Sequence, residues 1–302
     1  MKRRLAAGLA AVLVLGTLAT SSMRAPASAA DCPNGGTVRM GIEPFEVPAK
    51  LQPLFDTIGQ MVGQKLGCKV EIFVATNYNA EIEAMRSGKL EIGEFGPLGY
   101  ILAHQVAKAE AVATYATADG KKPSVYYASI VTHPGSGITT LKQVAGHSFA
   151  YSDPDSTSGH LFPAYALRKV GIDPDSGVKG VYAGSHTASF EALRNAKVDA
   201  GELNSQMIES AQTAGSYKSG DFVVLWRSNP IPTDPISVRG DLPDSFKTRV
   251  RDAFVSLDLT SPSFDPGHVL KGFGYRFVPA TDAMYQQIRD LVTTLNIDLT
   301  KM

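Results

Sequence analysis

The 302-residue sequence predicts an α/β fold of two lobes with a ligand cleft between them. Three observations lead to this prediction: strand-like runs alternate with helical patterns, one segment is used twice, and two extended segments flank its second copy. Once a leader is set aside, about 270 residues remain, which exceeds one small core and suits two lobes of ordinary domain size.

The strand-like runs read, in chain order, TVRMGI, KVEIFV, KLEIGEF, ASIVTH, SFAYS, GVYAG, VDAGEL and FVVLW. Helical patterns lie between them. In LQPLFDTIGQMVGQKLG, six apolar side chains share one face of the predicted helix: Leu51, Leu54, Phe55, Ile58, Met61 and Val62. Alternation of this kind predicts an α/β fold with mostly parallel sheet.

The first thirty residues have the pattern of a secretory signal peptide. A basic start and a short apolar segment, MKRRLAAGLAAVLVLGTLAT, precede the small residues of SMRAPASAA, which place the cleavage after Ala30. Removing residues 1–30 deletes four of the 29 basic residues and no acidic one, which leaves 25 against 29 acidic residues and a net charge of about −4. This charge argues against nucleic acid as a partner. Since no later segment is apolar for long enough to cross a bilayer, we expect a periplasmic protein.

Cys32 and Cys68 each lie just ahead of a strand-like run, TVRMGI in one case and KVEIFV in the other. In an oxidising compartment, an even pair of cysteines favours a disulfide over a metal site or a catalytic thiol. If the two strands are parallel neighbours, their starts are adjacent and a bridge is geometrically reasonable. We therefore expect a disulfide. Because Asp31 stands between the cleavage point and Cys32, no lipid anchor is expected.

One segment recurs without a gap: EAMRSGKLEIGE at Glu83–Glu94 and EALRNAKVDAGE at Glu191–Glu202, 108 residues apart. Six of the twelve positions are identical. A match this short is either the convergent pattern of any helix-to-strand turn or the sign of two lobes of similar design. The second interpretation places the loops after the two strands, residues 95–97 and 203–205, at a shared cleft, because open α/β sheets bind ligands at the carboxyl ends of their strands.

Two segments that flank the second copy look like crossings between the lobes. YYASIVTHP, near 126–134, continues one lobe into the other as an extended strand, and SNPIPTDPISVR, near 228–239, returns it with three stiffening prolines. We therefore place lobe 1 at residues 31–127 plus 235–302 and lobe 2 at residues 128–234. Two crossings with a cleft between them make a hinge suited to closure around a ligand.

The segment DPDSTSGHLFPAYALRKVG places three hydroxyl residues and a glycine in front of an apolar run with helical spacing. A helix N-terminus presents backbone N–H groups without partners and the positive end of the helix dipole, so it attracts anions. Ser156, Thr157 and Ser158 would add hydroxyl donors, and Gly159 would let the backbone approach closely. Pro163 is tolerated if the helix begins near Ser158. Plain N-capping is the alternative, although three hydroxyls exceed what a cap needs.

These motifs together resemble the substrate-binding proteins of phosphonate, phosphite and phosphate-type ABC transporters. The resemblance covers nearly all of the mature chain. It is carried by NYNAEIEAMRSGKLEIGEFGPLGY, YYASIVTHPGSGI, DPDSTSGHLFPAYAL, GSHTASFEALRNAKVDAGELNS and IPTDPISVRGDLP in this order. The combination is specific, although each piece alone is weak.

The resemblance implies a two-lobed type II periplasmic-binding-protein fold of the Venus flytrap kind, which grips a small phosphorus oxyanion between its lobes and needs no cofactor. The hydroxyls of the helix start hold the phosphoryl oxygens, the histidine of GSHTAS donates to another oxygen, three tyrosines close the cage, and the aspartate of IPTDP accepts from a protonated oxygen or an amine. The residues assigned in this way are Tyr78, Tyr126, Tyr127, Ser156, Thr157, Ser158, His186 and Asp234.

One departure from the family concerns Gln206, which stands where relatives that bind aminophosphonates tend to place a second acid. Without that ammonium partner, phosphite, methylphosphonate or a phosphate-like ion becomes the expected ligand. Glu202 lies nearby but echoes Glu94 of the repeat, so its role in the scaffold stays open. As partners we expect a membrane ABC permease docking on both lobes, with the binding protein itself a monomer.

Two other functions were weighed against transport. For an exported hydrolase, the nearest approach to a nucleophile elbow is GHSFA at Gly146–Ala150, which lacks the final glycine, and the six histidines show no metal-binding spacing. We therefore expect no enzyme activity and no metal. A periplasmic sensor that signals to a membrane histidine kinase, for a phosphorus oxyanion or for arsenite, keeps the same fold. Arsenite would favour free thiols in the cleft.

Overall fold

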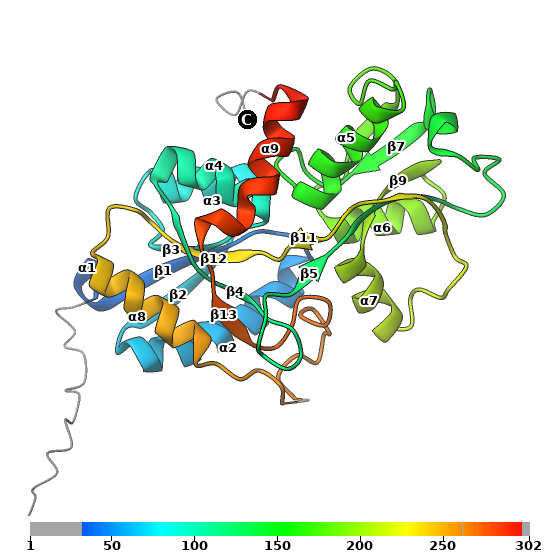
Figure 1. Ribbon diagram of the computed structural model, residues 1–302. Helices are drawn as coiled ribbons and strands as arrows, with labels where there is room; N and C mark the ends of the chain where they lie inside the picture. The colour runs from blue at the N-terminus through cyan, green and yellow to red at the C-terminus, as the bar shows by residue number, and fades with distance from the viewer. Residues whose placement is uncertain (1–31, 262, 298–302) are drawn as a thin grey trace, which may run out of the picture.

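The computed structural model describes residues 32–261 and 263–297. The predicted signal peptide falls outside this range. Within it, none of the helices is both long and apolar enough to cross a membrane. The described chain forms two β-sheets side by side, each covered by helices, with two extended segments running between them (Figure 1).

The first sheet has six strands, and its central strands are the first two predicted from the sequence. In spatial order the strands are β13 (Phe277–Pro279), β4 (Glu110–Tyr115), β12 (Pro235–Val238), β3 (Ile92–Glu94), β1 (Thr37–Ile42) and β2 (Lys69–Val74). β1 pairs in parallel with both β2 and β3. Because β1 and β2 start side by side, Cys32 and Cys68 meet and form the predicted disulfide, with an S–S distance of 2.07 Å.

Helices cover both faces of this sheet. One face packs against α2 (Pro48–Leu66) and α8 (Asp244–Val255), and the other against α3 (Tyr78–Arg86), α4 (Pro97–Ala107) and α9 (Gln286–Leu295). The face of α2 predicted to be apolar is buried, apart from the half-buried Met61. The short helical turns near this sheet are α1 (Pro33–Gly36) and η4 (Asp282–Tyr285).

The second sheet has five strands and is drawn from the middle of the chain. Its strands are β10 (Val223–Arg227), β6 (Ala128–Thr132), β9 (Ala200–Asn204), β7 (Ser148–Tyr151) and β8 (Lys179–Tyr182). Helix α5 (Phe162–Lys169) lies on one face, and α6 (His186–Arg194) and α7 (Ser205–Thr213) lie on the other. A 3-10 turn, η2 (Leu141–Val144), precedes β7.

The expectation of mostly parallel pairing was wrong. In the first sheet β12 runs antiparallel between β3 and β4, and in the second sheet β6 runs antiparallel to β9 and β10. The chain reaches β6 and β12 directly from the segments that connect the two sheets. Each of these strands therefore runs opposite to the strands that belong to the βα units of its sheet. These connecting segments pair with each other through β5 (Val125–Tyr126) and β11 (Ile231–Pro232). The lobe boundaries at 127/128 and 234/235 remain an interpretation of this arrangement.

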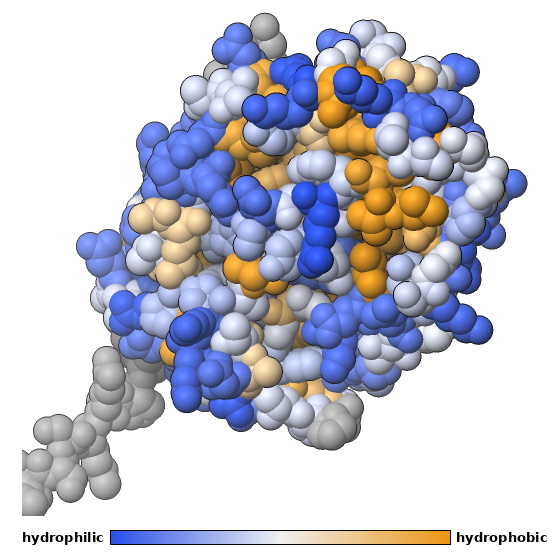
Figure 2. Space-filling model, turned by 45° about the vertical axis from the view of Figure 1, so that its right-hand side comes forward, coloured by the Kyte–Doolittle hydropathy of each residue, from blue (hydrophilic) through white to orange (hydrophobic). Residues whose placement is uncertain are grey.

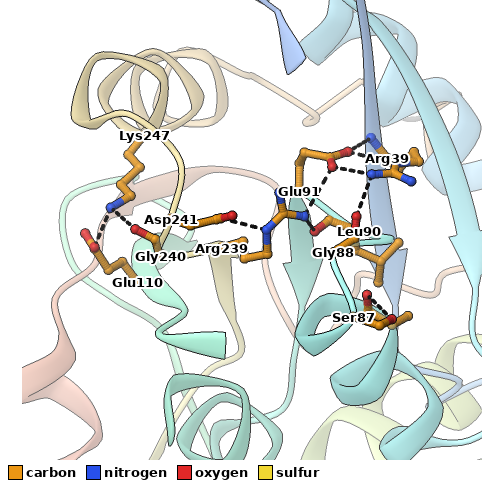
Figure 3. A network of polar contacts seen from close by, with 11 residues as sticks. Arg39, Ser87, Gly88, Leu90, Glu91, Glu110, Arg239, Gly240, Asp241 and Lys247 are labelled. Carbon is orange, nitrogen blue, oxygen red and sulfur yellow. Dashed lines mark hydrogen bonds and ion pairs between the residues drawn. The ribbon is translucent and has the colours of Figure 1, made fainter. Parts of the chain in front are cut away.

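A buried ion-pair network holds the first sheet together (Figure 3). The side chain of Glu91 has no exposed surface. It accepts hydrogen bonds from the backbone and guanidinium of Arg39 on β1, at 2.5–3.0 Å, and contacts Arg239, which follows β12, at 3.3 Å. Burial alone would raise the pKa of Glu91, but the hydrogen bonds from Arg39 outweigh it and lower that pKa. The network thus fixes β1 and β12 relative to the turn before β3.

On the face shown in Figure 2, apolar side chains gather in patches near the top and right of centre, and polar side chains surround them. In the second sheet, both edge strands expose apolar side chains. Val181 on β8 is 50% exposed, and Val224 on β10 is 56% exposed. These strands end the sheet on either side, so the apolar exposure lies at its edges and away from the cavity described next.

Candidate ligand-binding site

A small cavity lies between the two sheets, with a volume of about 40 Å³. One buried water requires about 10–15 Å³ on the same scale, so the cavity admits a group the size of a few waters. Seven of the eight residues assigned from the sequence line it: Tyr78, Tyr126, Ser156, Thr157, Ser158, His186 and Asp234. They come from both sheets and from the segments that connect them.

The exception is Tyr127. Neighbouring residues of an extended strand point to opposite faces, so Tyr126 faces the cavity while Tyr127 faces away from it. The Tyr127 ring stacks under the Arg227 guanidinium at 3.9 Å, and its backbone exchanges hydrogen bonds with Ser205. The structure therefore does not bring Tyr127 to the cavity.

The hydroxyl motif forms the mouth of a helix, as expected, but that helix begins with a π-helical turn, η3 (Thr157–Leu161), before α5. The Ser156 hydroxyl caps this turn by accepting from the Gly159 N–H at 3.1 Å. Pro163, the second residue of α5, follows this π-helical turn directly, and the carbonyl of Gly159, four residues before it, accepts from the Ser152 N–H. A Cβ at Gly159 would lie 1.7 Å from the Ser152 hydroxyl oxygen, so glycine here serves the close approach of Ser152.

The three hydroxyls are fixed by partners on several elements. Thr157 Oγ1 accepts from the backbone N–H of Leu98 in α4 at 2.8 Å. Ser158 Oγ accepts from Asn204 Nδ2 at 3.2 Å. Tyr126 hydrogen-bonds with the hydroxyls of both Ser158 and Thr157. The helix mouth therefore presents preorganised donors, since few of these side chains need to reorient when a ligand arrives.

His186 is held against the helix mouth by a carboxylate. Its Nδ1 lies 3.0 and 3.1 Å from the two carboxylate oxygens of Glu202, and its Nε2 lies 3.4 Å from Ser156 Oγ. Burial alone would lower the pKa of His186, but the Glu202 charge and hydrogen bond outweigh it and raise that pKa above the ordinary value. Glu202 thus fixes the ring through Nδ1, so that Nε2 faces the Ser156 hydroxyl in the cavity wall, and it favours the protonated form of the imidazole.

The internal repeat relates the two walls of the cavity. Tyr78 and His186 lie 108 residues apart, and each is the first residue of its helix, after the capping side chains of Asn77 and Ser185. The loops after the two repeated strands also meet the cavity, through Gly96 in one lobe and Asn204 in the other. This is the placement expected for the carboxyl ends of strands in an open α/β sheet.

Sequence reasoning missed several residues of the wall. Two are acids, Glu43 and Glu46, which follow the first buried strand in GIEPFE; an acid directly after a strand was the available signal. The apolar part of the wall is formed by Phe45, Met207, Val269 and Phe273. No lysine or arginine is among the described residues that line the cavity.

Asp234 completes the wall from the segment that leads into β12. Its side chain is 6% exposed, and burial raises the pKa of its carboxyl to about 7, although the nearby His186 opposes that rise. Asp234 can therefore exchange a proton near neutral pH. Together with the hydroxyls and His186, the cavity offers donors for an anion and an acid that responds to the protonation of that anion.

The structure also shows where the residues lie that a hydrolase or an arsenite sensor would use. GHSFA runs into β7, where the Ser148 hydroxyl donates to Asp199 Oδ2 at 2.6 Å, so this serine serves the sheet. Cys32 and Cys68 are bonded to each other and neither lines the cavity. The free thiols that arsenite would favour are thus not found among the described residues.

Comparison with known proteins gives consistent matches. The profile of the family described as "ABC transporter, phosphonate, periplasmic substrate-binding protein" matches residues 40–285. The phosphate-import protein PhnD of Mycolicibacterium smegmatis is 26% identical, over 84% of each chain. The phosphonates-binding periplasmic protein of Escherichia coli is 29% identical, over 84% of this chain and 75% of its own.

Solved structures agree with this match. A binding component of an ABC phosphonate transporter from Pseudomonas aeruginosa superposes with a TM-score of 0.75 at 26% identity, covering 86% of both chains. PhnD1 of Prochlorococcus marinus, in complex with methylphosphonate, gives a TM-score of 0.75 at 22% identity, covering 86% of this chain and 98% of that one. These neighbours confirm the two-lobed α/β fold of the type II periplasmic-binding class.

Proposed function

Since this chain belongs to the family of periplasmic substrate-binding proteins of phosphonate ABC transporters, we propose that its cavity captures a small phosphorus oxyanion, such as phosphite, methylphosphonate or a phosphate-like ion, for import. Members of this family bind and deliver a substrate and are not enzymes, so this chain is a transport protein. The membrane partner that we propose is an ABC permease that docks on both lobes of the closed protein.

The observation that carries the proposal is the joint presence of the hydroxyl helix mouth and His186 in one small, buried cavity. Charge-assisted hydrogen bonds strengthen as water leaves, so a cage of hydroxyls, a helix N-terminus and one imidazolium can hold an oxyanion tightly. The Thr157 to Leu98 hydrogen bond joins the two walls at the same point. A ligand that orders Thr157 would therefore also favour closure.

The size and chemistry of the cavity favour a compact ligand. Gln206 lines it where relatives that bind aminophosphonates place an acid, and its Nε2 has no partner among the described residues. The amide thus offers a further donor to an oxyanion. Phe45, Val269 and Phe273 form an apolar surface that suits a P–H or P–CH₃ group. These features support phosphite or methylphosphonate alongside phosphate.

Isothermal titration calorimetry of the mature protein, stripped of bound ligand, tests the proposal. Phosphite, phosphate, methylphosphonate, aminoethylphosphonate, sulfate and arsenite are each titrated under the same conditions. We expect micromolar or tighter binding of a phosphorus oxyanion and no heat with sulfate. Silence across the phosphorus compounds, or a response to arsenite alone, would refute the proposed function.

A further inference from the structure

A second acid belongs to this cavity besides Asp234. Glu43, which follows β1, is 2% exposed and lines the cavity. Its Oε2 accepts from the backbone N–H of Gly96, at the start of α4, at 2.7 Å. Its Oε1 has no hydrogen-bond partner among the described residues. Buried polar atoms normally have a hydrogen-bond partner, so an unpaired buried oxygen in a residue of the cavity wall is a candidate to form a hydrogen bond with a bound ligand.

The position of the Glu43 carboxyl group is fixed by two glycines in the first turn of α4. A Cβ at Gly96 would lie 2.9 Å from Glu43 Oε2, and a Cβ at Gly99 would lie 2.3 Å from Oε1. Any larger residue at Gly99 would displace the carboxyl group. The segment FGPLG therefore admits the Glu43 side chain against the start of α4, where Thr157 also arrives: a Cβ at Gly96 would lie 3.6 Å from Thr157 Oγ1, which accepts from the Leu98 N–H.

The charged surroundings of Glu43 disfavour its ionised form. Its neighbours include the buried acids Glu81 on α3, Glu94 on β3 and Asp234 beside β12. Tyr78 from α3 and Tyr126 from β5 also face it. His186, the basic side chain among the described residues that line the cavity, is already paired with Glu202. Burial, and then these neighbouring acids, raise the pKa of Glu43 well above its usual range, and only the Gly96 N–H opposes them.

We propose that Glu43 is a specificity-determining residue that meets the phosphorus oxyanion as an uncharged carboxylic acid and donates a hydrogen bond to it. The inference rests on the proposed function, since the oxyanion is its partner. Oε2 keeps accepting from Gly96, and the proton on Oε1 is donated to a ligand oxygen. An ionised Glu43 would repel the same anion, so the residue selects for anions that bring an acceptor oxygen to this wall.

Two variants separate a neutral donor from the alternatives. Glu43→Gln is isosteric, always uncharged, and can keep its oxygen on Gly96 while its NH₂ faces the cavity. Glu43→Leu is uncharged but cannot donate. By calorimetry at pH 6 with phosphite, phosphate and methylphosphonate, we expect Glu43→Gln to bind the ligand within about threefold of the unmutated protein and Glu43→Leu to bind about tenfold or more weakly. Thermal unfolding checks that both variants are folded.

A pH series adds a readout that a structural role alone would not change. From pH 5.5 to 9.5 the affinity of the unmutated protein should fall more steeply than that of Glu43→Gln, by up to about tenfold per pH unit once Glu43 ionises. Comparing the same ligand in both proteins cancels the ligand's own titration. Glu83→Gln is the control, because Glu83 is partly exposed, pairs with Arg86 and does not line the cavity, and we expect it to keep the steep profile.

Three results would overturn the inference: parallel pH profiles for the unmutated protein and Glu43→Gln, tighter binding by Glu43→Gln at pH 6, or unchanged affinity in Glu43→Leu. The second would mean that Glu43 is ionised and opposes the anion. The third would mean that it does not touch the ligand. Failure of the proposed function looks different, because the unmutated protein itself would then bind none of the three phosphorus anions.

Discussion

Replacing Glu202 by Gln tests whether His186 meets the ligand as a cation. Glu202 is 1% exposed and holds both carboxylate oxygens within 3.1 Å of Nδ1. With the carboxylate gone, the burial that it outweighs would lower the pKa of His186. The imidazole would then be neutral at pH 7 to 8, and its proton would no longer be fixed on the nitrogen that faces the cavity.

The expected loss of affinity follows from the difference between a charged and a neutral donor. A hydrogen bond to a charged group contributes about 1.5–3 kcal/mol, against about 0.5–1.5 kcal/mol for a neutral pair. Replacing the imidazolium bond by a neutral one, a difference of about 1–1.5 kcal/mol, therefore weakens binding by about 5- to 13-fold at pH 8. The loss shrinks toward acid pH. As the pH falls through the lowered pKa of His186, the ring regains its charge and the variant should approach the unmutated protein.

Calorimetry from pH 5 to 8.5, with an NMR titration of the His186 ring, measures both effects on the same protein. Glu191→Gln is a suitable control, since Glu191 belongs to the same repeat but lies on the surface, paired with Arg194. The reasoning would be refuted if Glu202→Gln bound the ligand as tightly as the unmutated protein at pH 8. A loss that is equal at every pH, with no change in the His186 titration, would also refute it.

Three further predictions concern the other parts of the site and the scaffold. Ser156→Ala combined with Thr157→Ala should weaken binding by roughly 2–6 kcal/mol by calorimetry; unchanged affinity in a folded variant would reduce the motif to a helix cap. Asp234→Asn should flatten the decline of affinity between pH 6 and 8, because ionisation of Asp234 near pH 7 opposes an anion; an unaltered profile would remove Asp234 from the site. Glu91→Ala should lower the free energy of unfolding by about 3–5 kcal/mol in urea titrations, since it leaves Arg39 without its buried partner, while ligand affinity stays the same; a change under 1 kcal/mol would contradict this.

The strands that the sequence identified are runs of apolar and β-branched residues bounded by turn residues, whether they are mostly buried, as β1 is, or lie partly exposed at the edge of a sheet, as β2 does. TVRMGI and KVEIFV coincide with β1 and β2, because apolar and β-branched residues fill them and turn residues bound them. The sequence predicts the residues of β12 as part of a crossing segment. Its prolines suggested a stiff linker, yet PISV is fully buried and takes the position between β3 and β4. A short strand of this kind is specified by the neighbours that enclose it, which lie far away in the sequence.

For the site, the sequence identified groups that act through local structure, such as the hydroxyls before a helix. It could not identify Glu43 as part of the cavity wall, because the placement of that side chain depends on Gly96 and Gly99, more than fifty residues later. Tyr126 and Tyr127 are indistinguishable by composition. Only the direction of the strand decides which of them faces the cavity.

The internal repeat explains why the two walls of the cavity are similar in form and different in chemistry. Its last residue is a glutamate in both copies, and both glutamates are buried. In the second lobe Glu202 pairs with His186 and favours its protonated form. In the first lobe, the residue equivalent to His186 is Tyr78, which carries no positive charge, and Glu94 receives only the Tyr115 hydroxyl, at 3.3 Å. Burial and then the nearby Asp234 raise the pKa of Glu94 well above its ordinary value, and the Tyr115 hydroxyl opposes that rise, whereas the carboxylate of Glu202 raises the pKa of His186.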